Sequence, residues 1–472
     1  MYTRYTYQDW LATPETARLV LLEDIVRTYK ASADVAAARQ SMAYFRADGT
    51  AVDSKVILQP SRVKVRGEDG VVRSAASTKD VIGNRAHSNF LRRFVVQENQ
   101  YLLGNGVTLD DEQTKARLGL GFDKLIAQAG EMALLQGVAW GYWNYDHMEL
   151  LRAYDGDLSG FVALLDERTG APMVGVQYWQ LDNDRPMYVR LFEADGVTEY
   201  VHTKDGLRVT QEKRPYKLTV ARYDTSAEVI GGENYGGALP IVPLYASDER
   251  KGVLTPALKS KIDMYERILS DFGDNLDRAN DVYWVLNNFG GTSEDIYEML
   301  AEINRLKAVV NISDGMGGGS TASPHTIEVP YQARQAALAL LEKALYADAM
   351  ALNMDELTGG SLTNVAIETA MTNLNLKCDR FEWQCFAFVQ GILRLIGVDT
   401  EEISFKRQTL ANRSEIVQDI AAMRQDIDHE TALKLNPYIT QEEIPQILQN
   451  VAAEQMTGAP TMEELERIVR EG

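Results

Sequence analysis

The glycine-rich run at residues 315–321, Gly-Met-Gly-Gly-Gly-Ser-Thr, comes closest in this chain to a ligand-binding motif. Backbone N–H groups of a glycine-rich loop cradle phosphates when the loop reads G-x-x-x-x-G-K-[ST] and opens a helix. This run lacks the lysine, and no helical pattern clearly follows it. The composition therefore predicts a flexible loop and not a nucleotide site.

The sequence also contains no complete motif for histidine-based or serine-based catalysis. His147 and Glu149 have the H-x-E spacing of zinc deaminases, but no P-C-x-x-C follows them. His429-Glu430 lacks the second histidine of H-E-x-x-H, and the chain has no G-x-S-x-G nucleophile elbow. We therefore expect no enzymatic activity, no cofactor and no metal, and a structural or conduit role is favoured by elimination.

The composition sets the broad class. The 472 residues are enough for two or three domains, and the 45% hydrophobic and 25% charged content is typical of globular proteins. A net charge of −20 disfavours a tight grip on nucleic-acid phosphates, which also suits a wall along which DNA slides. Cys378 and Cys385 are too few for a secreted disulfide framework and favour a reducing cytoplasm. No signal-peptide core or long apolar run is present, so no membrane span is expected.

Two long helices separated by a short break organise the C-terminal half. Residues 331–353 are rich in Ala and Leu, which have the lowest helix cost. The break at 354–364 contains Gly359 and Gly360, and a second helix is predicted over 365–396. At 1.5 Å per residue these helices span roughly 35 Å and 48 Å, which suggests assembly rather than a compact active site.

A helical wheel divides the first of these helices into three sectors. A bulky apolar sector and a shallow one that another helix could approach form the predicted subunit-packing surface of Leu338, Leu341, Leu345, Ala333, Ala337, Leu340 and Ala344. Between them lies a polar wedge, the predicted lumen face, of Gln332, Gln335, Glu342, Lys343 and Tyr346. Such a helix could be one of many packed side by side around a ring of subunits. The alternative is an internal helix of an ordinary bundle.

The remaining pattern predicts an α+β protein. Helices are expected over 1–46, 80–103, 122–141 and 255–283; the last has a heptad stripe and an opposite acidic face that should be solvated, with Asp263, Glu266, Asp274, Asp277 and Asp281. β-Branched and aromatic runs between turn signals at 161–223 predict an antiparallel meander, closed by an extended strip at 236–244. An insertion at 287–330 is predicted to contain helix 293–306 and strands 308–312 and 326–329. A short strand is expected at 402–406, followed by short helices to the end of the chain.

Several short motifs occur in a recognisable order. They are N-F-L-R-R-F-V-V with Y-L-L-G-N at 89–105, G-V-A-W at 137–140, D-E-R-T-G at 166–170, L-P-I-V-P-L at 239–244, L-T-G-G-S-L-T-N-V-A at 357–366 and I-S-F-K-R at 403–407. Together they resemble the portal proteins of tailed bacteriophages, of the SPP1-like type, over about residues 80–440. Gly106 and Asn364 depart from the family pattern at two loop positions, which leaves the loop shapes open.

The resemblance implies the portal-protein fold. It assigns 1–253 and the long helix 365–400 to an α/β wing with an antiparallel meander, 254–286 and 331–353 to two stem helices, 287–330 to a small α/β clip, 354–364 to a tunnel loop and 401–472 to a helical crown. It also implies that the tunnel loop lines the narrowest point of a DNA channel, with Met354, Asp355, Glu356, Leu357, Thr358, Gly359, Gly360, Ser361, Leu362 and Thr363.

In function, the resemblance implies a homo-oligomeric ring, typically of twelve subunits, at one capsid vertex. This head-to-tail connector would serve DNA packaging and ejection in the virion after assembly in the bacterial host cytoplasm. Expected partners are other copies, the terminase large subunit, a head-completion or adaptor protein, major capsid and scaffolding proteins, and double-stranded DNA as cargo, with no membrane. The alternatives are a packaging-associated nuclease or NTPase and a non-portal tail or baseplate ring component.

Overall fold

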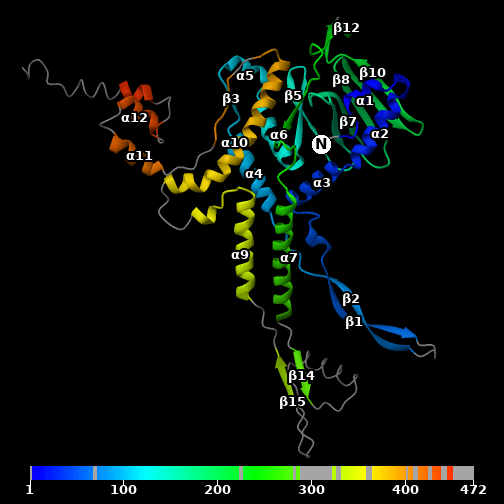
Figure 1. Cartoon of the computed structure of the whole chain (residues 1–472), viewed down its shortest axis with the longest axis vertical. Coiled ribbons are helices and arrows are strands. Elements are labelled where there is room, and N and C mark those ends of the chain that lie inside the picture. The colour runs from blue at the N-terminus through cyan, green and yellow to red at the C-terminus, as the bar shows by residue number, and fades with distance from the viewer. Residues whose placement is uncertain are drawn as a thin grey trace, which may run out of the picture.

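The computed structural model describes residues 3–66, 72–222, 227–279, 283–287, 321–325, 331–357, 364–399, 402–407, 413–423, 428–436, 439 and 444–449. Figure 1 shows a broad body of helices and sheets from which two neighbouring helices, α7 (Pro256–Ala279) and α9 (Tyr331–Asp348), extend as a stem. The mixture of helices with antiparallel sheets confirms the predicted α+β class.

Three helices open the chain, where the sequence predicts one helical lead-in over 1–46. They are α1 (Tyr7–Ala12), α2 (Arg18–Lys30) and α3 (Ala33–Arg46), with the 3-10 turns η1 (Glu15–Ala17) and η2 (Ala51–Ser54). Thr6 and Asp9 form a capping box at the start of α1, and the Ser32 hydroxyl caps α3. The predicted helical character is confirmed, and the capping residues explain why it is interrupted.

A long hairpin follows, which the sequence did not predict. Strands β1 (Val56–Arg66) and β2 (Val72–Ile82) pair only with each other and project from the body toward the side of the stem (Figure 1). Helix α4 (Phe90–Leu103) begins only after it, so the predicted helix 80–103 is wrong over its first ten residues. The reason is tertiary, because residues 84–88 are bound to α7 as described below.

The predicted meander is confirmed. Its sheet has the order β10-β9-β8-β7-β6 with every neighbour antiparallel, from strands β6 (Gly160–Leu165), β7 (Pro172–Trp179), β8 (Tyr188–Glu193), β9 (Gly196–Thr203) and β10 (Gly206–Arg214). The last predicted run forms a separate hairpin of β11 (Lys217–Arg222) and β12 (Ala227–Glu233).

A second sheet of three strands packs beside α6 (Phe122–Gln136). Its order is β13-β4-β5, from β4 (Val138–Asn144), β5 (His147–Arg152) and β13 (Ile241–Tyr245). The predicted helix 122–141 is therefore wrong beyond Gln136. Gly137 ends it with a φ of +87°, and a Cβ at this position would lie 2.5 Å from the carbonyl oxygen of Arg250, so only glycine fits.

Both stem helices end earlier than the sequence predicts. Helix α7 is described to Ala279, and Tyr283, predicted to be helical, lies instead in β14 (Tyr283–Asn287), which pairs with β15 (Thr321–His325). Helix α9 stops at Asp348 because Met350 has a φ of +50° and Ala351 N–H donates to the Tyr346 carbonyl, which closes the helix end. The predicted helix 293–306, strands 308–312 and 326–329 and most of the glycine-rich run 315–321 lie outside the described residues.

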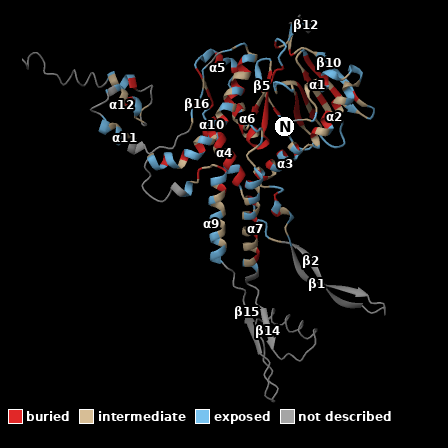
Figure 2. Ribbon diagram, viewed as in Figure 1, coloured by how far each residue is buried: buried red, intermediate tan, exposed pale blue. Residues whose placement is uncertain are grey.

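The long helix α10 (Asn364–Leu395) confirms the helix predicted over 365–396. It carries both cysteines buried and unpaired with each other, and it packs on α4 and β13 in the core of the body (Figure 2). The predicted strand 402–406 is β16 (Ile403–Phe405), paired with β3 (Val107–Leu109). The remaining elements are α5 (Glu112–Leu118), α11 (Arg413–Ala422) and α12 (His429–Leu435).

The acidic face of α7, expected to be solvated, is instead a docking surface. Ser88, Ala86 and Asn84 donate their backbone N–H groups to Glu266 (2.9 Å), to the Ser270 hydroxyl (2.9 Å) and to Asp274 (2.7 Å). A helix advances about 6.0 Å in four residues and an extended chain about 6.6 Å in two, so alternate N–H groups meet side chains one turn apart. We call these contacts the α7 ladder.

Glu266 is the buried centre of this ladder. Its side chain is fully shielded from solvent and also accepts hydrogen bonds from the Ser88 hydroxyl (2.8 Å) and the Thr50 hydroxyl (3.0 Å). Lys55 adds charge pairing at the far end, with its ammonium 2.5 Å from Asp274 and 2.7 Å from Asp271. The ladder therefore fixes the base of the β1–β2 hairpin to the stem.

Glu266→Ala should lower the free energy of unfolding by about 3–5 kcal/mol, because three donors would lose a charged acceptor inside the protein. Urea denaturation followed by circular dichroism measures the change. Arg267→Ala, on the exposed side of the same helix turn, is the control and should change stability by less than about 0.5 kcal/mol. Equal stability of the two variants would show that the ladder contributes little.

Candidate channel and assembly surfaces

The bulky apolar sector of α9, a helix that packs against α7, is shielded from solvent. Leu345 is fully buried and Ala349 nearly so, while Leu338 and Leu341 are half-buried. This part of the predicted subunit-packing surface is thus occupied within the chain itself.

The shallow sector of α9 is largely exposed within the described part of the chain. Ala333, Ala336 and Ala347 are exposed, and Leu340 is 71% exposed despite being apolar. Ala337 and Ala344 at its edge are half-buried. An exposed leucine among alanines leaves a smooth face that a neighbouring helix could approach closely.

The polar wedge of α9 is only partly exposed to solvent. Gln332, Gln335 and Lys343 are exposed and Glu342 is half-buried. Tyr346 departs from the prediction, because its ring packs edge-on against Phe94 (5.3 Å between centroids) and Phe90 (6.2 Å). The wedge therefore ends about one turn before the body of the protein begins.

The segment predicted as the tunnel loop begins in a fixed turn. The Gln97 side chain of α4 clamps the backbone of Leu352, accepting from its N–H (2.9 Å) and donating to its carbonyl (3.1 Å). After it, η3 (Met354–Leu357) follows with Met354 and Asp355 exposed. The other predicted loop residues lie outside the described residues: Thr358, Gly359, Gly360, Ser361, Leu362 and Thr363.

The next residue of α4 anchors the helix on the other side of that loop. The Glu98 carboxylate lies 2.6 Å from the Lys377 ammonium of α10; the Glu98 side chain is almost completely buried and that of Lys377 is mostly shielded, at 16% exposed. Burial raises the pKa of Glu98 above its ordinary value, and the charge of Lys377 opposes that rise. One turn of α4 thus holds both the entry to the loop and the helix that follows it.

Lys377→Met should lower the free energy of unfolding by about 3–5 kcal/mol, because it leaves Glu98 buried without its partner. The double variant Glu98→Leu with Lys377→Met should recover most of that loss, since a buried ion pair is often replaceable by apolar side chains. The denaturant midpoints of the parent protein, the two single variants Lys377→Met and Glu98→Leu, and the double variant measure both effects. A double variant no more stable than Lys377→Met would contradict this reasoning.

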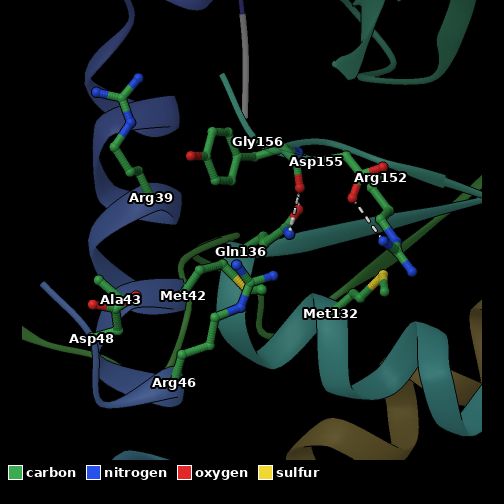
Figure 3. Close-up of a pocket in the computed structure, with 11 residues that line it drawn as sticks. Arg39, Met42, Ala43, Arg46, Asp48, Met132, Gln136, Arg152, Asp155 and Gly156 are labelled. Carbon is green, nitrogen blue, oxygen red and sulfur yellow. Dashed lines mark hydrogen bonds and ion pairs between the residues drawn. The ribbon is translucent and has the colours of Figure 1, made fainter. Parts of the chain in front are cut away.

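The cavities of the body show no catalytic arrangement among the described residues. Figure 3 shows one of about 210 Å³ between α3, α6 and the end of β5, lined by Arg39, Arg46, Arg152 and Met132 among others. Two of its cations are already paired, Arg152 with Asp155 at 2.6 Å and Arg39 with Asp157 at 2.7 Å. No nucleophile with an adjacent base lines this cavity.

The residues of the incomplete histidine motif also lack a metal-site geometry. His147 contacts Asp146 at 2.8 Å and Glu149 at 3.3 Å on an exposed turn, and the hydrogen bond to Asp146 raises the pKa of this histidine. Across the described ranges, no group of three or more His, Cys, Asp or Glu side chains could hold a metal ion. None of the described helices is both long and apolar enough to span a membrane.

Comparison with known proteins identifies the family. The chain matches the family described as "Phage portal protein, SPP1 Gp6-like" over residues 66–457, which is most of its length, and it belongs to that family. It is also similar to the Portal protein of Clostridium phage phiCD119, with 29% identity over 164 residues, or 33% of this chain and 36% of that protein. This similarity thus spans about a third of the relative's length.

A solved structure described as the neck of an empty GTA particle, computed with C6 symmetry, also aligns with the chain. Its sequence identity is 12% and its TM-score 0.42, with coverage of 74% of this chain and 90% of that one.

Proposed function

We propose that this protein is the subunit of a ring-shaped phage portal that forms a DNA channel at one capsid vertex. Membership of the portal family over residues 66–457 is the observation that carries this proposal. Two features of the structure support it: a projecting two-helix stem and an exposed Ala and Leu340 face on α9 that can receive a neighbouring copy. If this face of each copy contacts a different face of the next copy, the contacts repeat around an axis. They close a ring when the rotation from one subunit to the next is a whole-number fraction of 360°.

Within this proposal the parts of the chain have separate tasks. Residues 1–253 and 365–400 form the wing, 254–286 and 331–353 the stem, 287–330 the clip, 354–364 the tunnel loop and 401–472 the crown. The clip docks the terminase large subunit during packaging and later the head-completion protein, while the wing and crown meet capsid and scaffolding proteins. Double-stranded DNA passes as cargo, and the ring, of twelve copies, assembles in the host cytoplasm before entering the virion.

Electron microscopy of the purified chain tests the proposal. Closed rings with a central hole are expected, and native mass spectrometry should give a mass near twelve copies. Monomers alone across a range of salt concentrations would overturn the ring. Saturable ATP binding or DNA cleavage by the purified protein would favour the alternative of a packaging-associated enzyme, and a ring found in tails rather than at the capsid vertex would favour a tail component.

A further inference from the structure

A strained tyrosine, Tyr145, marks another surface of the body. Tyr145 is the central residue of the turn between β4 and β5. Its φ is +61°, and Asp146 N–H donates to the Asn144 carbonyl at 2.8 Å across it. Three-residue turns with positive φ at the centre are rare and strained, and a bulky side chain in that region is an outlier.

Three hydrogen bonds hold Tyr145 in this conformation. Its N–H donates to the Tyr235 hydroxyl oxygen (3.1 Å), that hydroxyl donates to the Trp143 carbonyl (3.0 Å), and the Trp143 indole N–H donates to the Tyr145 carbonyl (3.1 Å). The Tyr145 side chain itself is 61% exposed. The surroundings therefore present the ring to solvent instead of burying it, and they keep it there against local strain.

A cationic cavity of about 650 Å³ lies beside this ring. Arg117 of α5, Lys217 of β11 and Arg394 of α10 line it together with apolar groups that include Leu395. Arg117 donates to the Ile396 carbonyl, and the Lys217 ammonium lies 4.5 Å from the Tyr235 ring centroid. Among the described residues, neither cation lies within ion-pair distance of a carboxylate, although Asp111 interacts with Arg117 at longer range. The lining carboxylate, Asp146, is paired with His147.

We propose that this Tyr145 surface, made of Tyr145, Arg117, Lys217, Arg394 and Leu395, binds an acidic segment of a partner protein that carries an apolar side chain between its carboxylates. Charge complementarity supports this choice, because three cations line one cavity in a chain of net charge −20. A pre-ordered tyrosine beside arginines is also the composition of interface hot spots.

A peptide fits this surface better than a nucleic acid does. A concave site of this volume suits a compact ligand such as a short peptide segment, whereas nucleic-acid backbones are followed by extended grooves of cations.

The identity of residue 145 gives a direct test. Glycine adopts positive φ without steric cost, so Tyr145→Gly should raise the Tm of the protein while it removes the aromatic contact. Tyr145→Phe keeps the ring and should keep binding, without the rise in Tm. A lowered Tm in Tyr145→Gly would show that the tyrosine serves stability, which would overturn the proposal.

Photo-crosslinking in assembled particles tests the partner. Benzoylphenylalanine at position 145 should crosslink to a peptide of another protein that is rich in Asp and Glu, identified by mass spectrometry. The same probe at Leu181, 74% exposed elsewhere in the body, should not give that product. Lys217→Glu with Arg394→Glu should reduce the crosslinked yield about tenfold, the effect of losing roughly one interface hot spot.

Crosslinks to DNA, to a second copy of this chain, or to nothing would each overturn the proposal. The crosslinking experiment rests on the proposed function in one respect, because it uses assembled particles that must contain the portal ring. Electron microscopy of the probe-bearing chain is therefore done before irradiation. Rings without the expected crosslink contradict the Tyr145 surface alone, and absent rings contradict the proposed function.

Discussion

A chain carrying Leu340→Glu is expected to fold normally and to remain monomeric, giving no rings by native mass spectrometry or electron microscopy. In the single chain Leu340 is 71% exposed, so a glutamate there would sit in water and would cost the fold little. In the proposed ring the same position lies between helices, where an unpaired carboxylate loses its hydration without gaining a partner. Repetition of that cost at every subunit contact prevents closure.

Two further variants make this result interpretable. Gln335→Glu adds the same charge on the exposed polar wedge of α9 and should still form rings. Ala344→Glu should also block assembly, but Ala344 is half-buried, so its circular dichroism melting curve must be compared with that of the parent protein. Rings of normal mass from folded Leu340→Glu would exclude this face of α9 from subunit contacts.

Local patterns in the sequence were sufficient for elements whose contacts are local. The strands of the meander alternate with turn dipeptides such as Asp195-Gly196, and each pairs with the next along the chain, so their order could be predicted. The apolar sector of α9 likewise indicated a side that is shielded from water, but the structure shields it within the chain, whereas the prediction placed it between subunits. The meander is specified by neighbours in sequence, and the structure agrees with it.

Long-range contacts explain what the sequence could not show. The carboxylates of α7 resemble a solvated face until residues 84–88 are seen to donate to them across about 180 positions of chain. Gln97 looks like any surface glutamine of α4, and its clamp on Leu352 depends on how the stem joins the body. The helical wheel places Tyr346 in the polar wedge, yet its ring packs against Phe90 and Phe94. In each case the side chain contacts residues that are distant in sequence, and only the tertiary structure shows those contacts.

The Tyr145 turn is the clearest example of a site without a sequence signal. A two-residue hairpin loop is normally predicted from glycine or asparagine at its first position. Here the loop between Asn144 and His147 is Tyr145-Asp146, so that signal is missing. Nothing local marks the positive φ, because the partner of the Tyr145 N–H is the hydroxyl of Tyr235, some 90 residues away. An unusual backbone angle at an exposed aromatic became visible only with the fold.

The second large effect is expected at the start of the proposed tunnel loop. Asp355→Lys together with Glu356→Lys should leave procapsid assembly intact and should slow DNA packaging about tenfold or more at low salt, with recovery as salt rises. Asp355 is exposed in the fixed turn that follows the Gln97 clamp, so its charge is presented at a defined place. Assembly should be unaffected because the packing faces of α9 are unchanged.

The charge reasoning behind this prediction is cumulative. In a ring of about twelve copies the native carboxylates would form a negative collar that repels phosphates, whereas lysines would release counterions from passing DNA and hold it. Asp355→Asn with Glu356→Gln is the matched control, because it removes repulsion without adding attraction and should slow packaging far less. The measurement is the rate and extent of packaging into procapsids at several salt concentrations. Normal rates for the double lysine variant at every salt concentration would mean that these residues do not face the DNA, and the tunnel-loop assignment of 354–364 would then be abandoned while the ring itself could stand.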